Sequence, residues 1–326
     1  MKSMTRTHAR HPGSSPAEPA RREAGGPPGG RVRPRSTQWA AWGFLAPVLC
    51  YLALFYAYPL YRNLDLSVHH YTVRSFVQGG APFSGLTNYQ EILGNATFLP
   101  ALAHTVVFTV VSLGFQFSIG LALAVFFTQR FRLSATLRAL FLVPWLLPLI
   151  VSASTWSWLL NSDSGLVNWV LGSVGVGPVH WLTSPTWSLV SVIIANIWIG
   201  IPFNLVVLYS GLQSIPDALY EAAAIDGANA WQRFWRITFP LLRPVSAITL
   251  LLGLVYTLKV FDIIWIMTKG GPADSSTTLA TWSYRLGFGS QLPAFGPGAA
   301  VGNLLVVIAL AFGLIYIRIQ NKQREA

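Results

Sequence analysis

Charged residues are scarce in this 326-residue chain. Asp, Glu, Lys and Arg make up 10% of the sequence, whereas hydrophobic residues make up 53%. An ordinary soluble domain carries roughly 25% charged residues. The composition therefore excludes a typical soluble protein and predicts a protein that lies in a membrane.

Cysteine and the common catalytic motifs are also lacking. Cys50 is the single cysteine, which excludes a disulfide framework or a cysteine-based metal site within the chain. None of the four lysines follows a glycine, so there is no P-loop, and neither His-Glu-x-x-His nor Gly-x-Ser-x-Gly occurs. The adjacent His69 and His70 do not predict a shared metal site, since helical neighbours point about 100° apart. We expect a chain that is not an enzyme and holds no cofactor or metal of its own.

Long apolar runs are present instead, and six of them approach the roughly 20 residues that cross a bilayer. Helices are expected, because open sheet edges are not stable in hydrocarbon. The sequence predicts an all-α polytopic membrane protein with spans at 42–61, 105–128, 139–160, 186–210, 245–268 and 297–317.

The net charge of +11 raises the possibility of nucleic-acid binding, but the positions of the basic residues argue against it. With an internal N-terminus, seventeen of the 22 Lys and Arg residues lie in inner segments and four in outer segments. The positive-inside rule then places both termini in the cytoplasm.

Residues 1–37 are rich in Pro, Gly and Arg and contain few large apolar side chains, which predicts a disordered, basic cytoplasmic tail. Residues 38–326 form one membrane domain. A cleaved signal peptide is the alternative for the first 60 residues, but the apolar run begins too late and exceeds the 7 to 15 residues of a signal core.

A polar segment, "EAAAIDGANAWQRFWRITFPLLRP", separates the fourth and fifth spans. Pro216 suits a helix start, the following alanines favour a helix, and Gly227 suits its end. A second short helix, carrying Trp231, is expected to stop at Pro240. From the residues alone, this element either docks a soluble partner or lies on the lipid headgroups.

The segment resembles the EAA loop of permease subunits in binding-protein-dependent ABC importers, which has Glu-Ala-Ala, then Gly, then Ile-x-x-Pro. After the fifth span, "FDIIWIMTKGGPADSSTTLATWSYRLGF" is similar to the carbohydrate branch, the maltose and glycerol-3-phosphate type permeases. The resemblance in arrangement covers roughly residues 39–322.

This resemblance implies a type I importer fold in a bacterial cell membrane and a carbohydrate substrate. It also implies three kinds of partner: a second permease, two ATPase subunits that hold ATP and Mg, and an extracytoplasmic sugar-binding protein. The loop at about 212–243 would carry a cytoplasmic coupling helix. Its expected coupling residues are Glu221, Ala222, Ala223, Asp226, Gly227 and Ala228.

A sugar path requires hydrogen-bonding groups within the membrane. Asn196 and Thr257 lie about 22 Å and about 20 Å from the inner ends of their spans, so their depths match. Together with the family's use of these two spans, this makes Asn196, Phe203 and Thr257 candidate contacts, although Gly253 and Val260 lack the polar groups that a sugar contact needs. Alternatively, Asn196 only bonds a neighbouring helix.

Lys259 and Asp262 stand three residues apart in the fifth span, where a lone charge is costly. We expect an ion pair between them; the alternative is a cavity or outer-gate role for Asp262. Lys269 to Pro272 predict a tight outer turn or, alternatively, a contact with the binding protein.

Two other classes of protein fit less well. A secondary transporter needs intramembrane ionisable residues and usually shows repeats, and an intramembrane enzyme needs a catalytic set.

Overall fold

The computed structural model describes residues 35–129, 131–289 and 293–325. The chain divides into two compact units, residues 1–54 and 55–326. The described residues form helices joined by turns, with one isolated antiparallel bridge between His69 and Phe83. The predicted tail lies outside the described residues except for its last three, with which the first helix begins.

Sixteen α-helices and two π-helices follow one another along the described part of the chain. They are α1 (Arg35–Leu52), η1 (Ala53–Ala57), α2 (Tyr58–Ser67), α3 (Val73–Gln78), α4 (Thr87–Gly94), α5 (Phe98–Thr128), α6 (Ser134–Phe141), α7 (Val143–Leu146), α8 (Leu149–Leu159), α9 (Leu166–Ser173), α10 (Ser188–Gln213), α11 (Asp217–Ile225), α12 (Ala230–Arg233), η2 (Phe234–Thr238), α13 (Phe239–Leu258), α14 (Asp262–Met267), α15 (Leu279–Phe288) and α16 (Phe295–Glu325).

Five helical stretches in the described residues are long and apolar enough to cross a membrane. They are Trp42–Ser67, Phe98–Thr128, Ser188–Gln213, Ala230–Leu258 and Phe295–Arg318. The chain is thus an all-helical polytopic membrane protein, but the six uninterrupted spans that we expected are not all present.

The third expected span, at 139–160, is broken into α6, α7 and α8, so its prediction as one helix is wrong. The break falls at Leu147 and Pro148, whose ψ angles of 140° and 135° are extended. A proline ring disfavours helical geometry for the residue before it, which explains the extended Leu147. Only Leu149–Leu159 remains as a shorter apolar helix.

The fifth expected span, at 245–268, is also wrong at both ends. Its helix begins earlier, because α12, η2 and α13 form one continuous stretch, Ala230–Leu258, and Pro240 does not stop it. It also ends earlier, at Leu258, and the chain turns through Phe261 (φ −123°) before α14 begins.

A π-helical turn explains how the chain continues through Pro240. η2 ends one residue before the Phe239–Pro240 pair, which then occupies the first turn of α13. The first turn of a helix does not need the N–H that proline lacks. The same arrangement recurs at Pro59, which follows η1 at the start of α2.

The second unit is built on α5, which packs closely against α10. A side chain at Gly120 would meet Asn204 at 2.5 Å, and one at Gly200 would meet Gln116 at 2.2 Å. Gln116 Nε2 donates to the carbonyl oxygen of Asn196 at 2.9 Å. Small residues and interhelical hydrogen bonds of this kind hold helices together where lipid supplies no hydrophobic drive between them.

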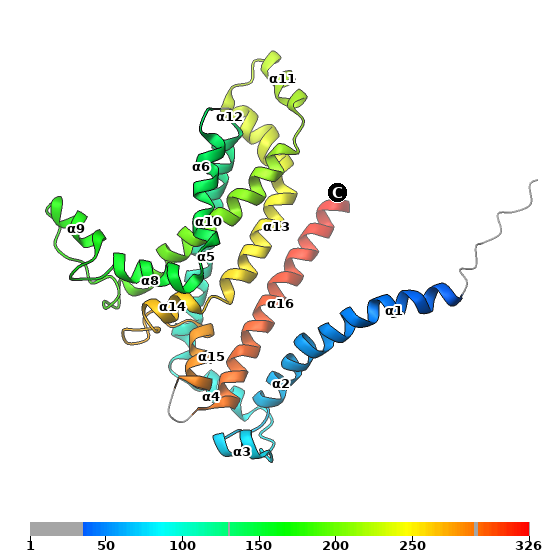
Figure 1. The fold of residues 1–326 in the computed structure, drawn as a ribbon, viewed down its shortest axis with the longest axis vertical. Coiled ribbons are helices and arrows are strands. Elements are labelled where there is room, and N and C mark those ends of the chain that lie inside the picture. Colours follow the sequence, from blue (N-terminus) through cyan, green and yellow to red (C-terminus); the bar gives the residue numbers. More distant parts are fainter. Residues whose placement is uncertain (1–34, 130, 290–292, 326) are drawn as a thin grey trace, which may run out of the picture. The chain divides into compact units, whose positions relative to one another are not determined.

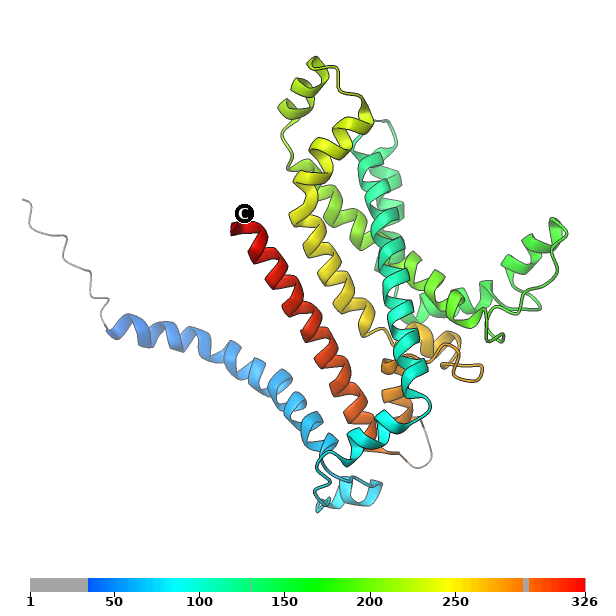
Figure 2. The same cartoon turned by 180° about the vertical axis from the view of Figure 1, so that it is seen from behind.

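The two ends of this unit differ. α11 and α12 lie at one end, and α3 and α4 lie at the opposite end (Figures 1 and 2). At the second end, Asn63 Nδ2 donates to Asn303 Oδ1 at 2.6 Å and Asn303 Nδ2 donates to the Tyr89 hydroxyl at 3.2 Å, joining α2, α4 and α16.

Replacing Gly120 by alanine tests the α5–α10 contact. We expect Gly120→Ala to destabilise the protein by about 1 to 3 kcal/mol, because the new methyl group overlaps Asn204. Gly114→Ala, on the same helix with nothing within 4 Å, is the control and should not lower the melting temperature. Thermal melting of the detergent-purified protein measures both, and equal melting of the two variants would contradict this account of the packing.

Candidate functional site

Helix α11 presents an exposed surface at one end of the second unit (Figure 1). It has no buried residue; Glu221 and Ala222 are exposed, and Ile225 is 87% exposed. Sequence reasoning missed Ile225, although its spacing of four from Glu221 puts both on one face. This face offers a carboxylate, a small residue and a bare apolar side chain.

The end of α11 is held by a pair of backbone hydrogen bonds. Ala228 N donates to Ala223 O at 2.9 Å, and Gly227 N donates to Ala224 O at 3.1 Å, which together form a Schellman motif. Gly227 adopts a φ of +77°, and nothing lies within 4 Å of the position of a side chain there. Glycine is therefore favoured at this position by backbone geometry and not by crowding within the chain.

Two sets of side-chain contacts anchor α11 and the helix that follows it. The Tyr220 and Thr238 hydroxyls lie 2.9 Å apart, joining α11 to η2, and Tyr220 packs on the buried cluster around Leu208. Asn229 and Gln232 exchange hydrogen bonds in a capping box at the start of α12. These contacts fix α11 to η2 and to the buried cluster, so the exposed face of α11 is held in place.

A cavity of about 410 Å³ lies between α5, α7, α8, α10, α13 and α14. This volume is in the usual range for small-molecule sites. The structure brings all four expected substrate-path residues to this cavity. They are Asn196 and Phe203 from α10, Thr257 from α13 and Asp262 from α14.

Both breaks in the apolar helices line this cavity. Leu147 and Leu149 flank the break at Pro148, and Lys259 and Val260 lie between α13 and α14. Irregular backbone is tolerated at membrane depth only where it is covered by protein or lines a cavity. Two of the places where the predicted spans fail thus line the cavity.

Asn196 contributes an unpaired polar group to the cavity wall. It is 5% exposed, and its Nδ2 has no hydrogen-bond partner in the structure. A buried polar group left without a partner costs about 1 to 3 kcal/mol. Thr257 is different, because its hydroxyl already donates to Gly253 O at 2.7 Å. Asn196 therefore carries an unsatisfied donor beside the cavity.

Aromatic side chains form an adjoining wall. Phe203 makes edge-to-face contacts with Trp145 and Tyr256, with ring centroids 6.3 Å and 6.1 Å apart. Sequence reasoning missed Trp145, Tyr256 and Gln116, which also line the cavity. The sequence could have indicated Gln116, because it is a lone amide in a long apolar run. It could not have indicated Trp145, because the helix break beside that residue was not predicted.

The expected ion pair between Lys259 and Asp262 is wrong. The structure contains no salt bridge between these two described residues, and the Lys259 ammonium lies 4.9 Å from the centroid of the Tyr256 ring. The reason is the helix break, since α13 ends at Leu258 and the two residues no longer share a helix face. Both charges are exposed and both line the cavity.

Comparison with known proteins identifies the family. Residues 116–325, more than half of the chain, match the family described as the binding-protein-dependent transport system inner membrane component. The chain belongs to this family. It is an inner-membrane permease subunit of the ABC importer kind, which has no cofactor and leaves ATP hydrolysis to a partner ATPase.

The permease is similar to several carbohydrate permeases. It is 36% identical to the trehalose/maltose transport system permease protein MalF of Thermococcus litoralis, over 86% of this chain and 93% of that one. It is 29% identical to the diacetylchitobiose uptake system permease protein DasB of Streptomyces coelicolor, over 96% and 97%. A solved bacterial alginate ABC transporter, in complex with an alginate pentasaccharide-bound periplasmic protein, matches with a TM-score of 0.76 and 25% identity, over 88% and 96%.

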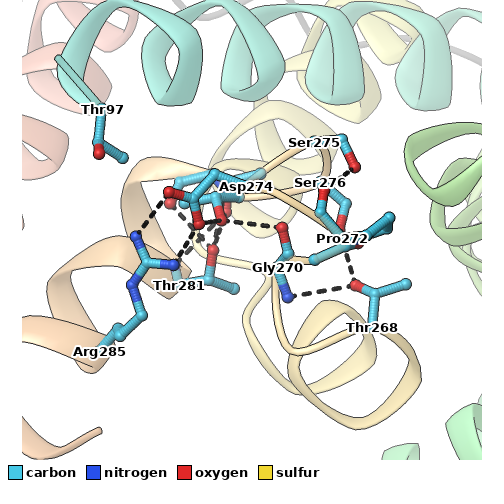
Figure 3. A network of polar contacts seen from close by, with 12 residues as sticks. Thr97, Thr268, Gly270, Pro272, Asp274, Ser275, Ser276, Thr281 and Arg285 are labelled. Atoms are coloured by element: carbon cyan, nitrogen blue, oxygen red, sulfur yellow. Dashed lines mark hydrogen bonds and ion pairs between the residues drawn. The ribbon is translucent and has the colours of Figure 1, made fainter. Parts of the chain in front are cut away.

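The segment between α14 and α15 of the permease is a tight turn, as Lys269 to Pro272 predicted. Lys269, Ala273 and Asp274 all have positive φ angles, of 53°, 46° and 62°. Such angles cost roughly 1 to 2 kcal/mol for residues with a side chain. Polar contacts surround the turn and hold it in this geometry (Figure 3).

These contacts reach several elements. Arg285 Nη1 and Nη2 donate to the Asp274 carboxylate, and the Thr277 hydroxyl donates to Gly270 O at 2.9 Å. His104 Nδ1 donates to Thr277 O at 3.1 Å, and the Ser188 and Ser275 hydroxyls lie 2.8 Å apart. The turn is therefore tied to α15, α5 and α10 together.

The ion pair shifts the titration of Asp274. Hydrogen bonding from Arg285 lowers the pKa of the Asp274 carboxyl below its ordinary value of 3.8, and partial burial opposes this only in part. A lowered pKa means that the pair stabilises the turn fully above pH 3.8. That stabilisation is lost only as the pH falls through the still lower pKa of the folded state.

Asp274→Asn tests this pair. We expect the amides of residues 270–278 to lose up to about five-fold of their protection from hydrogen exchange at pH 7, since a partly exposed pair contributes about 1 kcal/mol or less. Wild-type protection, corrected for intrinsic exchange rates, should stay constant between pH 7 and pH 5. Asp163→Asn, an exposed carboxylate in no salt bridge of the described residues, is the control. Unchanged protection in Asp274→Asn would show that the remaining contacts hold the turn without this ion pair.

Proposed function

We propose that this permease forms one half of the translocation path of an ABC carbohydrate importer. A second, related permease forms the other half, two ATPase subunits bind on the cytoplasmic side, and an extracytoplasmic binding protein delivers the sugar. The similarity to MalF and DasB, whose names specify trehalose/maltose and diacetylchitobiose, supports a carbohydrate substrate.

In this proposal both chain termini are cytoplasmic and α11 is the coupling helix. The basic residues support this orientation. The elements at the α11 end of the unit carry them: Arg138 is in α6, Arg233 in α12, Arg236 in η2 and Arg243 at the start of α13, and Arg132 precedes α6. α11 then faces the compartment that contains ATP. Its exposed carboxylate and small residues suit a cleft on an ATPase surface.

Motion is transmitted because α11 is fixed at its base. Glu221 pairs with a basic group of the ATPase, and Ala222 and Ala223 permit close approach. Asp226, Gly227 and Ala228 form the turn that returns the chain to α12. When ATP closes the two ATPases, α11 moves with them, and the bundle alternates between outward and inward access.

The sugar passes through the 410 Å³ cavity. The observation that carries this assignment is the unpaired Nδ2 of Asn196 in the wall that also contains Phe203 and Thr257. A sugar hydroxyl accepts from this amide, while the aromatic wall covers the apolar faces of the ring. Asp262, exposed at the same cavity, accepts hydrogen bonds from other hydroxyls.

Glu221→Ala and Gly227→Val test the coupling role. We expect each to lower ATP-driven uptake into proteoliposomes of the assembled transporter by about ten-fold or more, because a buried charge pair or the turn geometry is lost. The complex should remain partly assembled. Gly227→Asn should retain more activity than Gly227→Val, since asparagine tolerates a positive φ better than valine.

Glu91→Ala, an exposed glutamate in α4 at the opposite end of the unit, is the matched control and should transport normally. Normal uptake in both Glu221→Ala and Gly227→Val would rule out this coupling role.

Asn196→Leu tests the substrate path. We expect the concentration of loaded binding protein at half-maximal uptake to rise, or uptake to fall, by about five- to ten-fold, the effect of one lost hydrogen bond. Uptake of radiolabelled trehalose, maltose and diacetylchitobiose provides the measurement. Ile194→Ala, on the same helix but outside the cavity lining, is the control. Equal uptake by Asn196→Leu and wild type for every transported sugar would place the path elsewhere.

A further inference from the structure

A second, larger cavity lies at the α11 end of the permease. Its volume is about 930 Å³, and it is lined by the ends of α5 and α10, the start of α6, and parts of α11, α12 and η2. The lining includes hydroxyl or amide groups from Thr128, Gln129, Ser134, Gln213 and Tyr220. It is separate from the 410 Å³ cavity and shares no lining residue with it.

Two arginines of this cavity lack an anionic partner. Arg132 and Arg233 line it, and neither forms a salt bridge with a described residue. Asp217 is the one carboxylate among the lining residues; it occupies the first turn of α11, where the helix dipole stabilises a negative charge. The lining therefore has a net positive charge and many hydrogen-bond donors, which suits a phosphate group.

An apolar groove of about 400 Å³ adjoins this cavity. The two share Val125 and Phe234 in their linings. The remaining groove residues come from α5, α12, η2 and α13 and are almost all apolar. They are Phe117, Ser118, Leu121, Ala122, Trp231, Trp235 and Phe239. Trp231 and Trp235 are exposed, as expected for tryptophans at the boundary between lipid and water.

We infer that the cavity and groove together bind one anionic phospholipid of the cytoplasmic leaflet. The phosphate group lies between Arg132 and Arg233, and one acyl chain lies along the groove on α5. The charge complementarity selects an anionic headgroup, and the apolar groove that continues from the cavity selects a molecule with a long chain. This inference rests on the proposed orientation, which places the α11 end at the cytoplasmic leaflet.

The position of this site connects lipid binding to the helix proposed to couple the permease to its ATPases, α11. Tyr220 of α11 and Thr238 of η2 both line the cavity, and their hydroxyls form the 2.9 Å contact that anchors α11. A lipid seated there stabilises the base on which α11 is carried. Loss of the lipid should therefore weaken the coupling between ATP hydrolysis and transport without removing the coupling residues themselves.

Native mass spectrometry of the assembled transporter tests the inference. The purified complex is titrated with phosphatidylglycerol or with phosphatidylcholine of the same acyl chains. We expect preferential retention of phosphatidylglycerol, and a fall of roughly five-fold for each of Arg132→Gln and Arg233→Gln. Asp217→Asn should raise retention. Arg236→Gln, an exposed arginine of η2 outside both linings, is the matched control and should retain lipid normally.

A substitution in the groove distinguishes a lipid from a free anion. Ala122→Trp fills the groove without changing charge and should also lower retention of phosphatidylglycerol. Binding of inorganic phosphate, measured by calorimetry on the same variants, provides the second arm. Equal retention of the two lipids, normal retention in the Arg132→Gln/Arg233→Gln double variant, or phosphate binding that needs the arginines while Ala122→Trp has no effect would each overturn the inference. Because lipid retention is measured without transport, failure here leaves the transport function intact.

Discussion

The close approach of α5 to α10 is the contact on which the rest of the permease depends. It requires Gly120 opposite Asn204 and Gly200 opposite Gln116, and the hydrogen bond from Gln116 to the Asn196 carbonyl spans the same junction. In lipid, apolar side chains gain no hydrophobic free energy by packing against each other, so close packing and hydrogen bonds must hold helices together. This contact also places Gln116 and Asn196 in the wall of the central cavity.

Interrupted helices make that cavity possible. A straight helix in place of α7 and α8, or of α13 and α14, would present a regular surface, whereas the breaks at Pro148 and after Leu258 expose backbone and side chains toward one space. Free backbone groups are costly in hydrocarbon and are tolerated where protein or a polar cavity covers them. Polar contacts also hold the turn between α14 and α15. They join the broken fifth span to α5 and α10.

The spans that sequence reasoning placed well are those with an uninterrupted apolar run. α5 and α16 cover the expected segments and extend beyond them by up to eight residues, and α10 begins two residues late and ends three residues late. Gly227 lies in the turn that closes α11, as its residue type indicated. Two of the failures, the break in the third span and the early start of the fifth, have a common origin in proline. Pro240 has the first-turn position where it costs little, whereas Pro148 forces its neighbour out of the helix, and residue type alone does not distinguish the two cases.

Composition and local pattern by themselves determined that this chain is helical and lies in a membrane, because the lack of charge and the length of the apolar runs leave no other stable state. They also determined the short exposed helix with a glycine at its end, whose signals are local. Tertiary structure alone decided that Asn196, Phe203, Thr257 and Asp262 meet around one cavity, that Lys259 contacts a tyrosine instead of Asp262, and that Arg132 and Arg233 line one basic pocket. These relations join residues on different helices or across a break, and helix periodicity carries no information about either.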